Sequence, residues 1–163
     1  MQGRVALLQF EPLTLKALKP KETDFEPQTL GEHVRKRRLE LRLTQKQAAE
    51  RLGVNPWTVL NWEKDHTEPP IESMPAIIRF LGYDPFPEPK SLVERLLAKR
   101  RAMGWSIKEA ARQLGVDEGT WGDWERGGVI LYRNHRLLVA RLIDLPESEV
   151  DQDMGVRWNR LHK

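Results

Sequence analysis

The sequence predicts an all-α protein made of two similar helical halves, and three observations support this. Residues 44–54 read TQKQAAERLGV, and residues 106–116, sixty-two positions later, read SIKEAARQLGV. Each copy begins with a helix-capping pattern and ends just past a glycine. Apolar residues ahead of the first copy recur at helical spacing. The 163 residues are enough for two small domains, each with its own core.

The first 29 residues differ from the rest of the chain. The stretch RVALLQFEPLTLKAL alternates loosely between apolar and polar residues and is interrupted by Pro12. It predicts a short extended or β-like N-terminal arm. Beyond it, Leu30, Val34 and Leu41 have helical spacing and predict a first helix over 29–42.

Each repeat copy predicts a short helix with a defined start. Thr44 and Gln47 have the spacing of a capping box, in which two side chains satisfy backbone groups at the helix N-terminus. Ser106 and Glu109 repeat this pattern in the second copy. Each helix carries an Ala-Ala pair, which predicts close packing by a neighbouring element.

A second helix follows each of these after a tight turn. In the first copy Asn55 is a favoured N-cap and Pro56 a favoured first helical residue, so a helix is expected to start at this point. Asp117 has the same place in the second copy. Two short helices joined by a tight turn form a helix-turn-helix motif.

These features resemble the Xre/Cro family of lambda-repressor-like DNA-binding domains. The segment LTQKQAAERLGVNPWTVLNWEKDHTEP follows the family pattern of Leu-Thr-Gln, Ala, Leu-Gly-Val, a polar recognition stretch and Trp-Glu. The resemblance covers residues 30–82, and residues 92–146 resemble the family more weakly. Over positions 44–63 the two copies share nine identities. The resemblance implies two tandem five-helix helix-turn-helix domains, the second of them degenerate.

The chain is expected to divide into five segments. Prolines in GYDPFPEPK favour an extended, semi-stiff spacer that limits the relative positions of the two domains. Trp158 in the C-terminal tail is a candidate to dock on a domain or on a second subunit. The expected segments are an arm at 1–29, a helix-turn-helix domain at 30–83, a linker at 84–90, a degenerate second domain at 91–147 and a tail at 148–163.

The resemblance also implies two long-range ion pairs. In this family an arginine of the first helix pairs with the glutamate that follows the recognition-helix aromatic residue. Arg38 with Glu63, and Arg100 with Glu125, hold these positions at equal separation. Such pairs would fix how the first helix meets the third, and the alternative is that both arginines face water.

The resemblance assigns DNA contacts to the first copy. A recognition helix places a few side chains against base edges in the major groove while other groups bind phosphates. Gln45 takes the phosphate-binding role, and Asn61 can pair bidentately with adenine. Trp57 either faces DNA or is a displaced core residue, whereas Trp62 is expected to be buried. The predicted DNA-binding residues are Gln45, Lys46, Asn55, Pro56, Trp57, Thr58, Asn61 and Lys64.

The second copy departs from the family at the positions that would contact DNA. An isoleucine replaces the glutamine, two acids replace a proline and an asparagine, and two glycines weaken the helix. We expect this copy to keep the scaffold, with Trp105 and Trp121 adding apolar surface for dimerisation or interdomain packing. The departing residues are Ile107, Glu118, Gly119, Gly122 and Asp123.

Charge and composition narrow the function without deciding it. The net charge is only +3, and its basic clusters, RKRR at 35–38 and KRR at 99–101, fit either DNA contact or solvated helix faces. The absence of cysteine excludes disulfides, thiolate zinc sites and cysteine nucleophiles. The four histidines show no metal-ligand spacing, and there is no phosphate-binding glycine loop, so no catalytic residue, cofactor or metal is expected.

The leading expectation is a bacterial-type regulator that binds double-stranded DNA, most simply a transcriptional repressor. It would act in the cytoplasm, at the nucleoid when bound to DNA, without contact to a membrane. It is expected to be a homodimer that associates through the second domain or the N-terminal arm. The alternatives are a protein-interaction adaptor and an antitoxin-type autoregulator, both of which would use the same helices.

Overall fold

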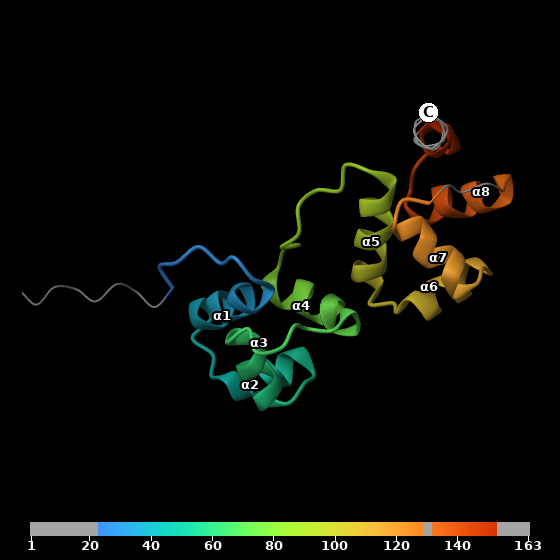
Figure 1. Ribbon diagram of the computed structural model, residues 1–163. Coiled ribbons are helices and arrows are strands. Elements are labelled where there is room, and N and C mark those ends of the chain that lie inside the picture. The colour runs from blue at the N-terminus through green and yellow to red at the C-terminus, as the bar shows by residue number, and fades with distance from the viewer. Residues whose placement is uncertain (1–22, 129–131, 153–163) are drawn as a thin grey trace, which may run out of the picture.

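The computed structural model describes residues 23–128 and 132–152, and its regular structure there is entirely helical. The all-α class is therefore confirmed for the described residues. Residues 1–22 of the arm, and Trp158, lie outside them, and residues 23–29 contain no strand. The elements are α1 (Leu30–Glu40), α2 (Gln45–Leu52), α3 (Pro56–Glu63), the 3₁₀ turn η1 (Ile71–Ser73), α4 (Met74–Leu81), α5 (Leu92–Met103), α6 (Ile107–Leu114), α7 (Glu118–Glu125) and α8 (Arg133–Leu142) (Figure 1).

Local sequence signals account for the ends of the two repeat helices. In α2 the Thr44 hydroxyl accepts from the N–H of Gln47, and the Gln47 side chain accepts from the N–H of Thr44 at 2.9 Å. In α6 Ser106 and Glu109 make the same reciprocal bonds. Both helices end at a glycine in the left-handed conformation, with φ of 70° and 68°. Both capping boxes are confirmed.

Two hydrophobic cores form, one in each half of the chain. The first lies among α1 to α4 and the second among α5 to α8. Seven residues of the first core have a counterpart sixty-two positions later in the second, so the repeat extends into the packing. The pairs are Val34 and Leu96, Ala48 and Ala110, Ala49 and Ala111, Leu52 and Leu114, Val59 and Trp121, Trp62 and Trp124, and Ile77 and Val139.

Five helices are expected in the first half. Its described elements are four α-helices and the single 3₁₀ turn η1. The segment before α4 contains two adjacent prolines, Pro69 and Pro70, which lack backbone N–H groups. Only one turn of 3₁₀ helix forms between these prolines and α4.

The predicted C-terminal tail, which begins at residue 148, overlaps a further helical segment. Residues 147–152 are helical, and Val150 is fully buried in the second core. Pro146 precedes this helix, and its fixed φ favours a helix start directly after it. The second half therefore extends at least to residue 152.

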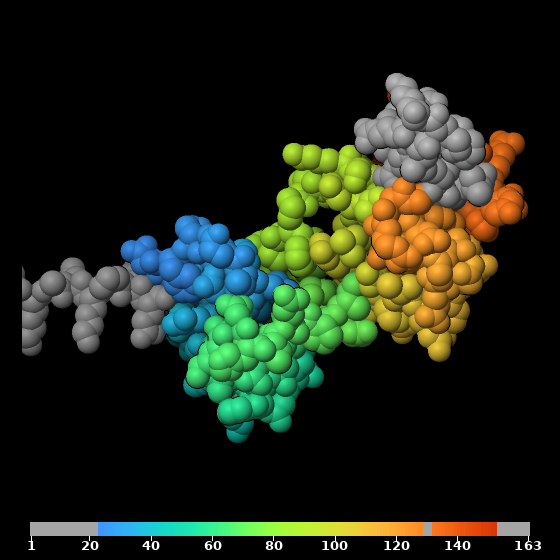
Figure 2. Space-filling model, viewed as in Figure 1, coloured from blue at the N-terminus to red at the C-terminus, as the bar shows by residue number. Residues whose placement is uncertain are grey.

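The two halves meet where α4 and η1 lie against the C-terminal end of α5. Gly104 ends α5 with φ of 66°, and a Cβ there would lie 2.9 Å from Pro75 Cγ and 3.2 Å from the Glu72 carbonyl oxygen. In the linker, the Arg101 guanidinium carbon lies 3.9 Å from the centre of the Phe86 ring. Figure 2 shows the resulting two lobes, which meet along the green to yellow part of the chain.

Candidate nucleic-acid interface

The first turn of α3 is fixed by its own sequence. Asn55 has an extended backbone, and its Oδ1 accepts from the N–H of Trp57 at 2.8 Å. Pro56 follows as the first helical residue, where its missing N–H costs nothing. The predicted helix start is confirmed, and the direction in which the Trp57 side chain leaves the helix is set by this turn.

The two faces of α3 have opposite characters. Val59, Trp62 and Glu63 are buried against the first core. Trp57 is 67% exposed, and Lys64, two turns further along the same face, is also exposed. The burial expected for Trp62 is confirmed, and Trp57 is not a displaced core residue.

A buried carboxylate links α3 to α1 and α2. Arg38 donates from Nε and Nη2 to the two Glu63 oxygens at 2.5 and 2.8 Å, and from Nη1 to the Leu43 carbonyl at 3.0 Å. Gln45 Nε2 also donates to Glu63, at 3.0 Å. One amide hydrogen of the predicted phosphate-binding residue is therefore used inside the protein, and the other is left for a ligand.

The second half builds the same cluster from a different set of donors. Arg100 donates to the two Glu125 oxygens at 2.6 and 2.9 Å and to the Trp105 carbonyl at 3.1 Å. Because Ile107 has no donor, the third bond comes from Trp121, whose Nε1 lies 2.8 Å from Glu125 Oε1. Both Arg–Glu pairs are thus present with matching geometry.

The role expected for Trp121 is wrong. Its side chain is fully buried, so it supplies no surface for a partner. In the repeat register it stands where Val59 stands in the first half, at a core position with space for a large ring. Trp105 is half-buried and packs against the same core.

The side chains of both basic clusters make contacts within the chain, with carboxylates, a carbonyl and aromatic rings. Arg35 nevertheless stays exposed, and the partner carboxylates Glu26 and Asp144 are 90% and 82% exposed. Besides the two arginines of the buried pairs, the contacts are Arg35 with the Phe25 ring at 5.7 Å, Lys36 with Glu26 at 3.7 Å, Arg37 with the Phe80 carbonyl at 3.3 Å, Lys99 with Asp144 at 3.2 Å and Arg101 with Phe86 at 3.9 Å. Lys46 on α2 and Lys64 at the end of α3 are exposed as well.

The equivalent surface of the second half is acidic at the start of its recognition-like helix. Hydrogen bonds from the hydroxyl and the backbone N–H of Thr120 lower the pKa of Asp117, the N-cap of α7. Glu118 follows it and is exposed. Negative charge at this end of the helix opposes the approach of a phosphate.

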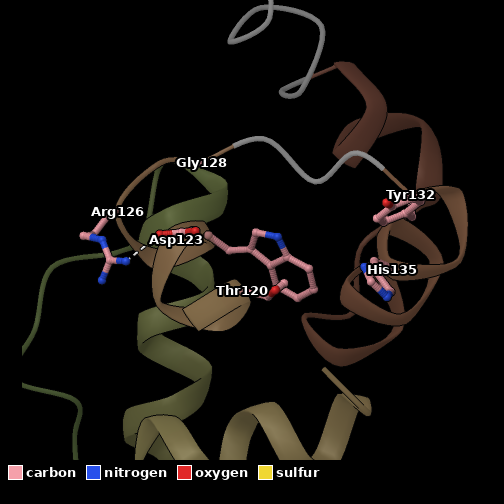
Figure 3. A pocket seen from close by; sticks show the side chains of 7 residues that line it. Thr120, Asp123, Arg126, Gly128, Tyr132 and His135 are labelled. Carbon is pink, nitrogen blue, oxygen red and sulfur yellow. Dashed lines mark hydrogen bonds and ion pairs between the residues drawn. The ribbon is translucent and has the colours of Figure 1, made fainter. Parts of the chain in front are cut away.

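A cavity of about 470 Å³ lies beside the C-terminal end of α7. Figure 3 shows the Asp123–Arg126 pair on one side of it and Tyr132 and His135 on the other. The Arg126 Nη2 to Asp123 Oδ1 distance is 2.5 Å, and the His135 ring makes edge contacts with Tyr132 and Trp124. Asp123, the counterpart of Asn61, therefore lies at the edge of this cavity in an exposed ion pair with Arg126.

A comparison with protein families matches residues 34–86 to a helix-turn-helix family. This region runs from α1 through α4 into the linker and includes the whole outward face of α3. A domain of this class indicates a DNA-binding transcription regulator. No match was found among curated proteins or among solved structures.

No helix in the described part of the chain has the length and apolar character needed to span a bilayer. The same described residues also contain no cluster of three histidine, aspartate or glutamate side chains suited to a metal ion.

Proposed function

We propose that this protein is a sequence-specific regulator of transcription that reads the major groove of double-stranded DNA with α3, most simply as a repressor. The observation that carries the proposal is the orientation of α3. Trp62 and Glu63 anchor one face in the core, while Trp57, Asn61 and Lys64 follow one another along the opposite face at one-turn intervals. Within the described residues this face carries no acidic side chain.

The side chains on this face have the chemistry that DNA contact requires. Asn61 can pair with the edge of an adenine through the oxygen and the NH₂ group of its side-chain amide. Lys46 and Lys64 are exposed and can neutralise phosphates. The second amide hydrogen of Gln45 can reach a phosphate while the first stays on Glu63. The remaining proposed contacts, near the start of α3, are Asn55, Pro56 and Thr58.

The second half supports a different role for the same scaffold. It keeps the packing and the ion pair but lacks the glutamine donor and carries acids at the start of α7. We infer that it is a degenerate helix-turn-helix domain that supports homodimer formation or holds the first half in place. The adaptor and antitoxin-type roles use the same surfaces and differ by the partner bound.

Selection of bound sequences from random duplex DNA tests the proposal directly. Asn61→Ala should remove the preference at one adenine and weaken binding by about 1 to 3 kcal/mol. Asp123→Ala, its counterpart in the second half, is the matched control and should leave affinity and preference unchanged. Lys64→Ala should weaken all sequences alike and reduce the salt slope by about one.

A palindromic selected site would support reading by two first halves in a homodimer. If no sequence is enriched and binding shows no dependence on salt, the regulator proposal fails and a protein partner becomes the better explanation.

A further inference from the structure

Trp57 is placed unlike the other tryptophans in the described residues. It is 67% exposed, whereas Trp62, Trp121 and Trp124 are buried and Trp105 is half-buried. Its indole makes no hydrogen bond, ring contact or cation contact to the described part of the chain. A side chain of this size leaves a large apolar area in water when nothing covers it. The residue is therefore free to meet a ligand without first breaking a contact.

The geometry of the first turn fixes the backbone that carries the indole. The Asn55 cap and the fixed φ of Pro56 restrict the backbone just ahead of Trp57. In helix-turn-helix complexes the N-terminal residues of the recognition helix are those that contact base edges. An exposed indole carried at this point is in a position to contact base edges.

The chemistry of indole limits what it can read. It has one N–H donor and no acceptor, so it cannot make the bidentate pairs that arginine and asparagine make. Its large faces are apolar, and the C5-methyl of thymine is the apolar group among the base edges of the major groove. Phosphate and sugar oxygens gain little from an apolar face.

We propose that Trp57 reads the C5-methyl group of a thymine in the bound sequence. This inference rests on the proposed function and adds a specificity-determining role for one residue. Asn61 lies one helical turn further along the same face, about 6 Å by helix rise. With about 3.4 Å between base pairs, the thymine is expected within about two base pairs of the adenine that Asn61 reads.

The second half provides an internal comparison. Gly119 stands at the position of Trp57 in the repeat register, and it has no side chain to contact a methyl group. Methyl readout is therefore a property of the first half alone, consistent with a single reading domain per chain.

The test replaces each thymine of the selected duplex in turn by deoxyuridine, which removes only the methyl group. Fluorescence anisotropy gives the Kd of each duplex for the wild-type chain, Trp57→Ala and Trp57→Phe. One replacement should weaken wild-type binding about fourfold, the loss expected for one buried methyl. The same replacement should not weaken Trp57→Ala, and Trp57→Phe should keep part of the effect.

The possible outcomes separate this inference from the proposed function. If the wild type binds the selected duplex but no deoxyuridine weakens it, Trp57 does not read a methyl group, although DNA reading stands. The same conclusion follows if the loss is equal in wild type and Trp57→Ala, since another residue or the DNA shape then senses the methyl. If no duplex is selected at all, the proposed function itself fails. Thermal unfolding of each variant confirms that the exposed position tolerates the change.

Discussion

The carboxylate of Glu63 is satisfied by three hydrogen bonds from two side chains on α1 and at the start of α2. Its side chain is 3% exposed and that of Arg38 is 13% exposed, so both charges are largely removed from water. A buried carboxylate is tolerated only when its lone pairs are matched in this way. The cluster therefore sets how the recognition helix sits on the helices behind it.

Replacing Arg38 by methionine should destabilise the fold, because Glu63 would stay buried without its cationic partner. Glu63 would keep a single amide donor and lose its counter-charge, so the free energy of unfolding should fall by about 3 to 5 kcal/mol. Urea denaturation followed by circular dichroism measures the change. Arg126→Ala is the control, because its pair with Asp123 is 68% exposed on both sides and should contribute about 0 to 1 kcal/mol. An equal fall in the free energy of unfolding in the two variants would show that the buried pair contributes no more to stability than the exposed pair.

Only part of this cluster could be predicted from the sequence. The two Arg–Glu pairs follow from equal spacing in the two copies together with the family resemblance. The third donor to each carboxylate could not be predicted. Gln45 and Trp121 occupy unrelated positions of the repeat, and only the folded chain brings each of them to its glutamate. The burial of Trp121 also depends on contacts with distant residues of the second core, so its position in the sequence does not indicate it.

Helix ends are the elements that local sequence determines best. The capping boxes of α2 and α6 and their terminal glycines form where the residues indicate, because these interactions span only three or four positions. The helix at residues 147–152 was missed because its burial depends on one valine that contacts a core formed by distant residues. The outward face of α3 could be predicted, since Trp62 and its neighbours have a fixed helical spacing.

The two capping boxes should respond differently to acid. Bonds from the backbone N–H and the hydroxyl of Ser106 lower the pKa of Glu109 below its usual 4.5. The ionised Glu109 carboxylate therefore contributes its full stabilisation above the usual pKa of 4.5. This stabilisation is lost as the pH falls through the lowered pKa of the folded state. Gln47, at the same position of α2, does not titrate.

NMR titration of the backbone amides checks this difference. The backbone amide signal of Ser106 should shift as Glu109 takes up a proton. The amide signal of Thr44 should show no such shift, because its capping partner Gln47 does not titrate. Glu109→Gln is the matched variant, since it gives α6 the same uncharged partner that α2 has. A Ser106 shift that persists in Glu109→Gln would mean that another group causes it.

At the scale of the whole molecule, the contacts between the two halves are closer than a proline-rich spacer alone would predict. The linker does not merely separate the halves, because Phe86 lies under the Arg101 guanidinium and Gly104 approaches Pro75. Only glycine fits there, since a Cβ would lie 2.9 Å from the proline ring and the backbone is left-handed. These contacts favour one relative orientation of the two lobes.

Double electron–electron resonance can test whether that orientation is held in solution. The chain has no cysteine, so Glu50→Cys on α2 and Gln113→Cys on α6 give two exposed labelling sites and no others. The distance distribution between the labels should be narrow. Arg101→Ala removes a cation–π contact worth about 0.5 to 2 kcal/mol and should broaden the distribution.

Lys99→Ala is the control for this experiment, because it removes an ion pair with Asp144 that lies wholly within the second half. Its distance distribution should match that of the parent chain. A broad distribution in the parent would mean that the halves move independently despite their contacts. Equal distributions in Arg101→Ala and Lys99→Ala would place the restraint in the stiffness of the linker and not in the Arg101–Phe86 contact. If the second halves form the dimer, the spacing between the two DNA half-sites depends on how this junction holds the two halves.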